Sequence, residues 1–126
     1  MLVLIVDDEP MVAETLRLIF RQHGLSAEVV YSSEQALTFV ARTTPDLVVC
    51  DIEMPGEDGV SLMKHLGRLL PACPILVLTG AYGSLTRIRE CAASLRQSVS
   101  IMTKPCQPSD LIFTADSMLG QVANRV

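Results

Sequence analysis

Short, continuously apolar runs alternate with helix-like segments along this chain, and that alternation is the feature that most constrains its fold. Residues 2–6 and 75–78 are apolar at every position and are too short for helices. Strands that are apolar on both faces must be buried on both faces, as they are in a parallel sheet covered by helices. The predicted strands are residues 2–6, 27–31, 46–50, 75–78 and 99–102.

The segments between these runs have helical periodicity. Val12 and Leu16 belong to an apolar face that recurs at helical spacing, and Gly24 follows it as a stop signal. Ser32 and Gln35 have the spacing of a capping box at the start of the next helix. Five such strand–helix units predict an α/β fold in which the sheet is doubly wound, with helices on both faces.

Length and charge limit the classes of function. A chain of 126 residues suits a single domain over residues 1–126, with no output domain in this chain. The net charge is −4 and no basic run could neutralise phosphates, so no direct nucleic-acid binding is expected. The apolar N-terminal run is too short for a signal peptide or a membrane span, so a cytoplasmic protein without membrane contact is expected. The four cysteines lack a zinc-binding pattern, which predicts reduced structural thiols.

Polar side chains follow four of the predicted strands at the point where each strand ends. They are Asp7 and Asp8, Asp51, Thr79 and Gly80, and Lys104. The carboxyl ends of parallel strands lie on one edge of a sheet, so these groups are expected to converge. Taken singly, Asp7, Asp8 and Asp51 could be helix N-caps. Lys104 alone could be a solvated surface residue.

The joint pattern has a specific chemistry. Three crowded carboxylates raise one another's pKa values unless a cation intervenes. Oxygen ligands suit a hard divalent ion, so Mg²⁺ is the expected cofactor, with Mn²⁺ as a substitute. Beside such an ion, Asp51 could accept a phosphoryl group as a nucleophile while Lys104 neutralises charge. Thr79 would donate a hydrogen bond to a phosphoryl oxygen, and Gly80 would leave room for the incoming group.

Four motifs on successive strand ends resemble those of the receiver domain of two-component response regulators, in its stand-alone form. They are VDDEP at 6–10, DIEMPGEDG at 51–59, LTG at 78–80 and TKP at 103–105. The resemblance covers essentially the whole chain and implies a flavodoxin-like (βα)5 fold with strand order 2-1-3-4-5. It also implies a phosphorylation-dependent signalling switch, which catalyses its own phosphorylation and dephosphorylation and is not a classical enzyme.

The resemblance assigns roles to individual residues. Asp51 would accept the phosphoryl group from the phosphohistidine of a histidine kinase, or from a phosphotransfer protein. Asp8, Asp51 and the main-chain carbonyl of Glu53 would bind Mg²⁺ directly, and Asp7 would act through water. Lys104 would pair with the Asp51 carboxylate and later with the phosphoryl group.

The residues that would transmit phosphorylation match the family pattern at some positions and differ at others. Thr79 would report phosphorylation by moving toward the phosphoryl group, and the Lys104–Pro105 peptide bond would be cis. The family often has an aromatic residue three positions before the lysine, where this chain has Ile101, which cannot swing a ring between two positions. Residues 91–100 also depart from the family pattern. The surface of helix four, strand five and helix five should therefore be unusual, whether it binds an unidentified protein target or a second copy.

Two other classes of function stay open on the sequence alone. Phosphohydrolases of the haloacid dehalogenase type also use an aspartyl nucleophile with Mg²⁺, but theirs lies after the first strand in a D-x-D context. Asp7-Asp8-Glu9-Pro10 does not supply that context. A pseudo-receiver, which binds proteins without being phosphorylated, would fit Ile101 but does not need the full set of site residues.

Overall fold

Five parallel strands form one sheet in the computed structural model, in the order β2-β1-β3-β4-β5. The structure describes residues 1–54, 59–80, 83 and 85–123. The strands are β1 (Leu2–Val6), β2 (Ser26–Val30), β3 (Leu47–Asp51), β4 (Ile75–Thr79) and β5 (Val99–Thr103). The helices are α1 (Pro10–Gln22), α2 (Ser33–Val40), α3 (Gly59–Leu69), α4 (Leu85–Ser94) and α5 (Pro108–Ala123). The expected doubly wound α/β fold with strand order 2-1-3-4-5 is confirmed.

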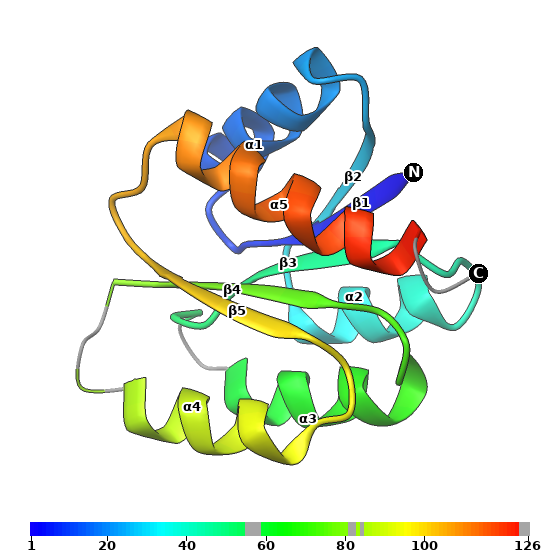
Figure 1. Cartoon of the computed structure of the whole chain (residues 1–126), viewed down its shortest axis with the longest axis vertical. Helices are drawn as coiled ribbons and strands as arrows, with labels where there is room; N and C mark the ends of the chain where they lie inside the picture. The colour runs from blue at the N-terminus through cyan, green and yellow to red at the C-terminus, as the bar shows by residue number, and fades with distance from the viewer. Residues whose placement is uncertain (55–58, 81–82, 84, 124–126) are drawn as a thin grey trace.

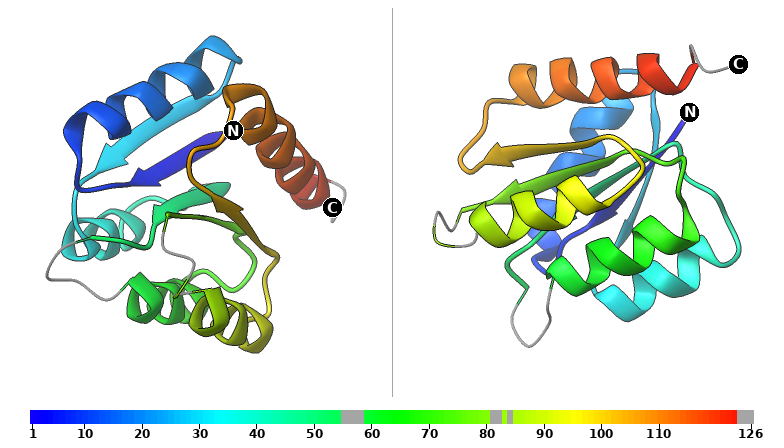
Figure 2. Two further views of the ribbon diagram at one scale, coloured as in Figure 1. Left: turned by 90° about the vertical axis from the view of Figure 1, so that its left-hand side faces the viewer. Right: turned by 60° about the horizontal axis from the view of Figure 1, so that its bottom comes forward.

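Helices cover both faces of the sheet. α1 and α5 lie on one face, and α2, α3 and α4 lie on the other (Figure 1). The two further views show the same layers (Figure 2). Along β3, Leu47 and Val49 pack in the core on the α1 and α5 side, whereas Val48 and Cys50 pack in the core on the other side. The sequence of this strand is apolar on both faces because both faces are buried.

The central strands and the edge strands differ in burial. β1, β3 and β4 are buried along nearly their whole length. β2 and β5 lie at the two edges of the sheet. In β2 only Ala27 and Val30 are buried, and β5 is half-buried up to its exposed last residue. Burial on both faces, which the apolar runs predict, is therefore correct for the three central strands and wrong for the two edges.

Two polar residues that were expected to follow strands are instead the last residues of strands. β3 ends at Asp51, which pairs with Leu78, and β4 ends at Thr79, which pairs with Thr103. The Ile52 N–H still donates to the Leu78 carbonyl, at 3.1 Å. The hydrogen-bonded sheet therefore holds the backbone of Asp51 and Thr79 in place. Positions 55–58 of the DIEMPGEDG motif lie outside the described residues.

The predicted helix signals are confirmed with one adjustment. At the start of α2, the Ser32 hydroxyl accepts a hydrogen bond from the Gln35 N–H at 3.1 Å. The Gln35 side chain accepts from the Tyr31 N–H at 2.8 Å, one residue before the cap, and not from the N–H of Ser32 itself. Gly24, the predicted stop for α1, has a φ of 84°, a conformation that glycine adopts easily.

The cysteines are present as thiols, and most of them are buried. Among the described residues the cysteines form no disulfide, and Cys50, Cys73 and Cys91 are buried. Burial raises the pKa of the Cys73 thiol to about 12, so this thiol is protonated at neutral pH. None of the helices that the structure describes has the length and hydrophobicity that crossing a membrane requires.

Candidate functional site

The candidate site lies at the carboxyl edge of the sheet. Asp7 directly follows β1, Asp51 ends β3, Thr79 ends β4, and Lys104 directly follows β5. The parallel register aligns these strand ends, and the Lys104 N–H donates to the Thr79 carbonyl at 2.8 Å. The structure thus brings together side chains that lie far apart in the sequence, as the topology predicts.

Three carboxylates form an acidic cluster at this edge. Asp7, Asp8 and Asp51 each offer one oxygen, and these atoms all lie within 4.8 Å of one another. Asp7 and Asp51 are only 1% and 3% exposed. In both, Oδ1 accepts the backbone N–H two residues on: that of Glu9 at 2.9 Å and that of Glu53 at 3.0 Å. These turns orient the carboxylates, and each turn uses only the Oδ1 atom of its aspartate.

The helix N-cap explanation for these aspartates is wrong. Glu9 is the N-cap residue of α1, so neither Asp7 nor Asp8 holds that position. Asp51 is the last residue of β3, and α3 begins only at Gly59. The sheet therefore positions these aspartates. Their side chains cluster at the carboxyl edge of the sheet and do not cap a helix.

Lys104 contacts the central carboxylate directly. Its Nζ donates to Asp51 Oδ2 at 3.0 Å, and its side chain is one-third exposed while that of Asp51 is buried. The surface explanation for Lys104 is therefore wrong. The Lys104–Pro105 peptide bond is cis, as the family resemblance implies.

Burial is the main cause of the raised carboxylate pKa values in the site. Burial raises the pKa of Asp51 to about 6, even though the hydrogen bonds from Lys104 and from the Glu53 N–H act in the opposite direction. Burial also raises the pKa of Asp7, and the neighbouring Asp8 adds to the rise. Burial lowers the pKa of Lys104, but the hydrogen bond and charge of Asp51 outweigh it, so this pKa is raised. The hydrogen bond and charge of Lys104 therefore only partly offset the effect of burial on the Asp51 carboxylate.

The acidic cluster fits a hard divalent cation. Asp7 Oδ2 and Asp8 Oδ1 are buried and accept no hydrogen bond within the part of the chain that the structure describes. Buried carboxylate oxygens without donors are costly unless a cation neutralises them. The donor set consists of oxygens only, which Mg²⁺ prefers.

The side chain of Glu53 takes a position that the sequence did not reveal. Its Oε1 accepts hydrogen bonds from the Thr79 hydroxyl at 2.6 Å and from the Gly80 N–H at 2.8 Å. The metal assignment implied by the family resemblance uses only the main-chain carbonyl of Glu53. The available signal is a long acidic side chain two residues beyond Asp51, just after the strand that neighbours the one ending at Thr79.

Ile101, at the position where the family often has an aromatic residue, lies within β5. It pairs with Val77 and is half-buried against the core on the side of α2, α3 and α4. Its side chain therefore packs against the core between the sheet and the helix layer that includes α4.

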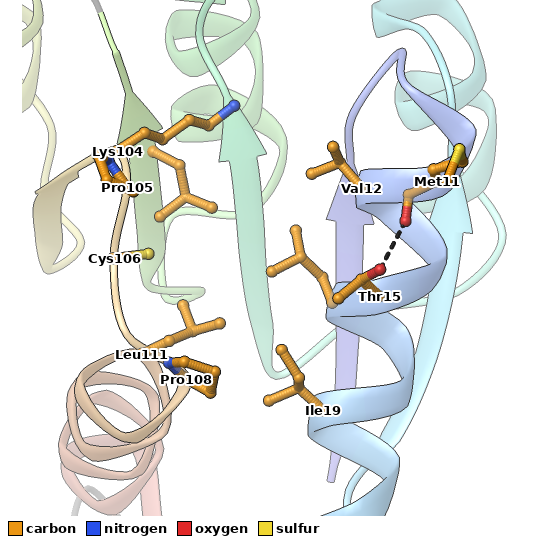
Figure 3. Close-up of a pocket in the computed structure, with 11 residues that line it drawn as sticks. Met11, Val12, Thr15, Ile19, Lys104, Pro105, Cys106, Pro108 and Leu111 are labelled. Atoms are coloured by element: carbon orange, nitrogen blue, oxygen red, sulfur yellow. Dashed lines mark hydrogen bonds between the residues drawn. The ribbon is translucent and has the colours of Figure 1, made fainter.

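An apolar groove borders the site on the other face. It has a volume of about 660 Å³ and runs between α1 and the segment that leads from β5 into α5. Lys104 and Pro105 lie on one side of it, and Met11 and Val12 lie on the other (Figure 3). Met11 is 85% exposed, and its carbonyl accepts a hydrogen bond from the Thr15 hydroxyl at 2.8 Å. The same lysine thus contacts the acidic cluster and lines the groove.

Comparison with known proteins agrees with this geometry. Residues 3–116 match the response regulator receiver domain family. The DNA-binding response regulator MtrA of Mycolicibacterium smegmatis is 32% identical over 110 residues, which are 87% of this chain and 46% of MtrA. The chain spans less than half the length of the curated relatives that it matches.

Solved structures show the same fold. The receiver domain of the Francisella response regulator 1452 superimposes with a TM-score of 0.83 at 27% identity, covering 95% of this chain and 97% of that one. A CheY-like receiver domain protein from Methanospirillum hungatei reaches a TM-score of 0.90 at 20% identity, covering 99% and 98% of the two chains. The chain therefore belongs to the response regulator receiver domain family, whose members are phosphorylation-dependent signalling modules and not classical enzymes.

Proposed function

We propose that Asp51 accepts a phosphoryl group and that this modification makes the chain a signalling switch. The observation that carries the proposal is the 3.0 Å contact between Lys104 Nζ and Asp51 Oδ2, beside the carboxylates of Asp7 and Asp8. A buried carboxylate with an ammonium group on one side and a cation-binding cluster on the other is suited to attack phosphorus. The donor would be the phosphohistidine of a histidine kinase or of a phosphotransfer protein, and acetyl phosphate is a small chemical substitute.

The transfer exchanges one bond to phosphorus for another. A carboxylate oxygen of Asp51 bonds to the phosphorus while the bond between phosphorus and the donor's imidazole nitrogen, or acetate oxygen, breaks. The bonding electron pair leaves with the donor, so acetyl phosphate releases acetate as an anion. A phosphohistidine whose other ring nitrogen carries a proton releases a neutral imidazole. Lys104 lies where it can neutralise the phosphoryl oxygens, and the Thr79 hydroxyl and Gly80 N–H are hydrogen-bond donors at the same edge.

We also propose the ligands of the metal ion. Asp8, Asp51 and the main-chain carbonyl of Glu53 would hold Mg²⁺, or Mn²⁺ in its place, and Asp7 would act through a water molecule. When bound, the ion supplies positive charge for the phosphoryl oxygens. The buried Asp7 and Asp8 oxygens, which accept no hydrogen bond from the described residues, support this assignment.

Mg²⁺ should stabilise the parent protein against heat, and Asp8→Ala should remove most of that effect. An ion that binds only the native state, at about 100 times its Kd, stabilises by about 2.7 kcal/mol. Asp110→Ala is a matched control because Asp110 is exposed on α5. The measurement is the thermal midpoint of each protein with and without MgCl2. An equal Mg²⁺ effect in Asp8→Ala and in the parent would contradict the metal assignment.

The stabilisation by Mg²⁺ should shrink as the pH falls through about 6. Burial raises the pKa of Asp51 to about 6, so protons compete with the ion for this carboxylate below that pH. The direction follows from the raised pKa: the ionised form, which the metal needs, dominates only above it. The thermal shift caused by Mg²⁺ is to be compared at about pH 7.5 and about pH 5. An equal shift at both pH values would contradict the prediction.

The output of the switch would be a change in what the chain binds. We propose that residues 1–126 act as one receiver domain in the cytoplasm, without direct contact with nucleic acid or membrane. Phosphorylation of Asp51 would alter the surface of α4, β5 and α5, on which Ile101 replaces the usual aromatic residue. That surface would bind a downstream protein or a second copy of the chain. The half-buried position of Ile101 next to the α4 layer supports a role in this surface.

Incubation with acetyl phosphate and Mg²⁺ tests the proposed function. Intact-mass spectrometry should show a gain of one phosphoryl group. The absence of any gain would overturn the switch and favour the pseudo-receiver alternative. Continuous release of inorganic phosphate from unrelated phosphomonoesters would favour the phosphohydrolase alternative, for which the family match gives no support.

A further inference from the structure

The carboxylate of Glu53 lies where the proposed function places the phosphoryl group. Its Oε1 accepts hydrogen bonds from the Thr79 hydroxyl at 2.6 Å and from the Gly80 N–H at 2.8 Å. The proposed function needs these same two donors for phosphoryl oxygens. Both distances are typical of hydrogen bonds to an anionic oxygen. The site thus already holds an anion before any phosphoryl group arrives.

The charge around Lys104 agrees with this placement. Burial lowers the pKa of Lys104, but the hydrogen bond to Asp51 and the charges of Asp51, Asp7 and Glu53 together outweigh it. Glu53 therefore lies close enough to influence the ammonium group. A phosphoryl group would use the Lys104 ammonium, the Thr79 hydroxyl and the Gly80 N–H. In the unphosphorylated protein each of these groups already contacts a carboxylate, that of Asp51 for the lysine and that of Glu53 for the other two.

We propose that Glu53 is an internal stand-in for the phosphoryl group, which occupies the Thr79–Gly80 anion site until phosphorylation displaces it. The inference rests on the proposed role of Asp51 as the acceptor. A hydroxyl and an N–H each carry a single hydrogen, so Glu53 and a phosphoryl oxygen compete for the same two bonds. The negative charge of Glu53 also repels an incoming phosphoryl donor.

The displacement is a rotation of one side chain. Ile52 and Met54, on either side of Glu53, are 7% and 3% exposed and pack in the core under α2, α3 and α4. The Glu53 N–H is bound to Asp51 Oδ1 at 3.0 Å. The backbone is therefore anchored, and only the Glu53 side chain is placed to turn away.

This arrangement changes what Thr79 can report. Thr79 is 1% exposed and already bonded inside the site. Its hydroxyl exchanges one anionic partner for another, so Thr79 needs little movement on phosphorylation. The larger rearrangement falls on the Glu53 side chain.

The rate of phosphorylation by acetyl phosphate with Mg²⁺ tests the competition. Glu53→Ala should react about tenfold faster than the parent, which corresponds to about 1.4 kcal/mol of activation free energy. Glu53→Gln keeps the size but removes the charge, so its rate should lie between the two. Glu28→Ala removes an equal charge from an exposed position on β2 and should leave the rate unchanged. The main-chain carbonyl of Glu53 is retained in every variant.

The Gly80 amide provides a readout that needs neither metal nor phosphoryl donor. In a ¹H–¹⁵N spectrum of the unphosphorylated protein, the Gly80 proton should move upfield in Glu53→Ala, because it loses a bond to a carboxylate. Glu28→Ala should leave that resonance in place. Assignment of the Gly80 signal by standard triple-resonance spectra makes the comparison direct.

The outcomes separate this inference from the proposed function. An unmoved Gly80 amide, or a Glu53→Ala rate equal to or below that of the parent, would overturn the stand-in role while leaving Asp51 as the acceptor. A parent and variants that all gain no mass would overturn the proposed function and, with it, the competition. A faster Glu53→Ala together with a shifted Gly80 amide supports both.

Discussion

Asp51→Asn is expected to abolish the mass gain that acetyl phosphate and Mg²⁺ cause in the parent protein. The amide is nearly isosteric with the carboxylate and can still accept the hydrogen bond that the Glu53 N–H donates to Asp51 Oδ1. It lacks a nucleophilic oxygen anion, and it cannot form an acyl phosphate by the exchange proposed above. Asp7 and Asp8 stay in place, so the variant tests whether Asp51 itself is the acceptor within the acidic cluster.

Asp110→Asn is the control for this experiment. Asp110 is exposed in the first turn of α5 and is not part of the acidic cluster, so this variant should gain one phosphoryl group as the parent does. A mass gain in Asp51→Asn equal to that of the parent would show that another side chain is the acceptor.

The stability of Asp51→Asn separates lost chemistry from lost folding. The pKa of Asp51 is raised in the folded protein, mainly by burial, so the ionised carboxylate that exists at neutral pH disfavours the metal-free fold. The neutral amide removes this cost. Lys104 loses a partner but is one-third exposed and stays hydrated. The thermal midpoint of the metal-free variant should therefore equal or exceed that of the parent.

Gly59→Ala is expected to destabilise the fold by about 1–3 kcal/mol, the range for forcing extra atoms into a packed site. A Cβ on Gly59 would lie 2.7 Å from the Ile52 carbonyl oxygen and 2.8 Å from the Ile52 Cα. These are backbone atoms, and the Ile52 N–H is tied to β4 through the Leu78 carbonyl. Either α3 moves away from the sheet or the segment directly after Asp51 moves.

Gly120→Ala is the matched control for this substitution. Gly120 also lies in a helix, but a Cβ there would meet no atom within 4 Å among the described residues. Alanine in a helix interior is more stable than glycine by about 0.5–1 kcal/mol, so Gly120→Ala should be neutral or stabilising. Urea denaturation gives both free energies of unfolding. A Gly59→Ala variant as stable as the parent would contradict the close packing of α3 on Ile52.

The fold could be predicted from the sequence because its signals are local. Runs such as Leu47–Val49 are apolar on both faces only when helices cover both faces of the sheet. The spacing of Val12 and Leu16 marks a helix that has one buried face. The burial of the edge strands was harder to predict from the sequence. It depends on whether a strand has a neighbouring strand on one side or on both. No local pattern states which of the two applies.

Most of the candidate site was also predictable. Parallel strands send their carboxyl ends to the same edge, so a polar residue at the end of each strand is enough to place Asp7, Asp51 and Lys104 together. Their residue types, together with the family motifs, then indicate the chemistry. The length of each strand was less certain, and the structure includes Asp51 and Thr79 in the hydrogen-bonded sheet.

The sequence by itself determined the layers of the fold, the edge at which the polar groups meet, and the set of groups that meet there. Only the tertiary structure decided which of these groups touch. The Glu53 carboxylate reaches Thr79 and Gly80 because β3 and β4 are adjacent and the side chain adopts one rotamer of several. The burial that raises the pKa of Asp51 is likewise a sum over packed neighbours from several elements. Both depend on distances across the sheet, which periodicity and motif spacing do not contain.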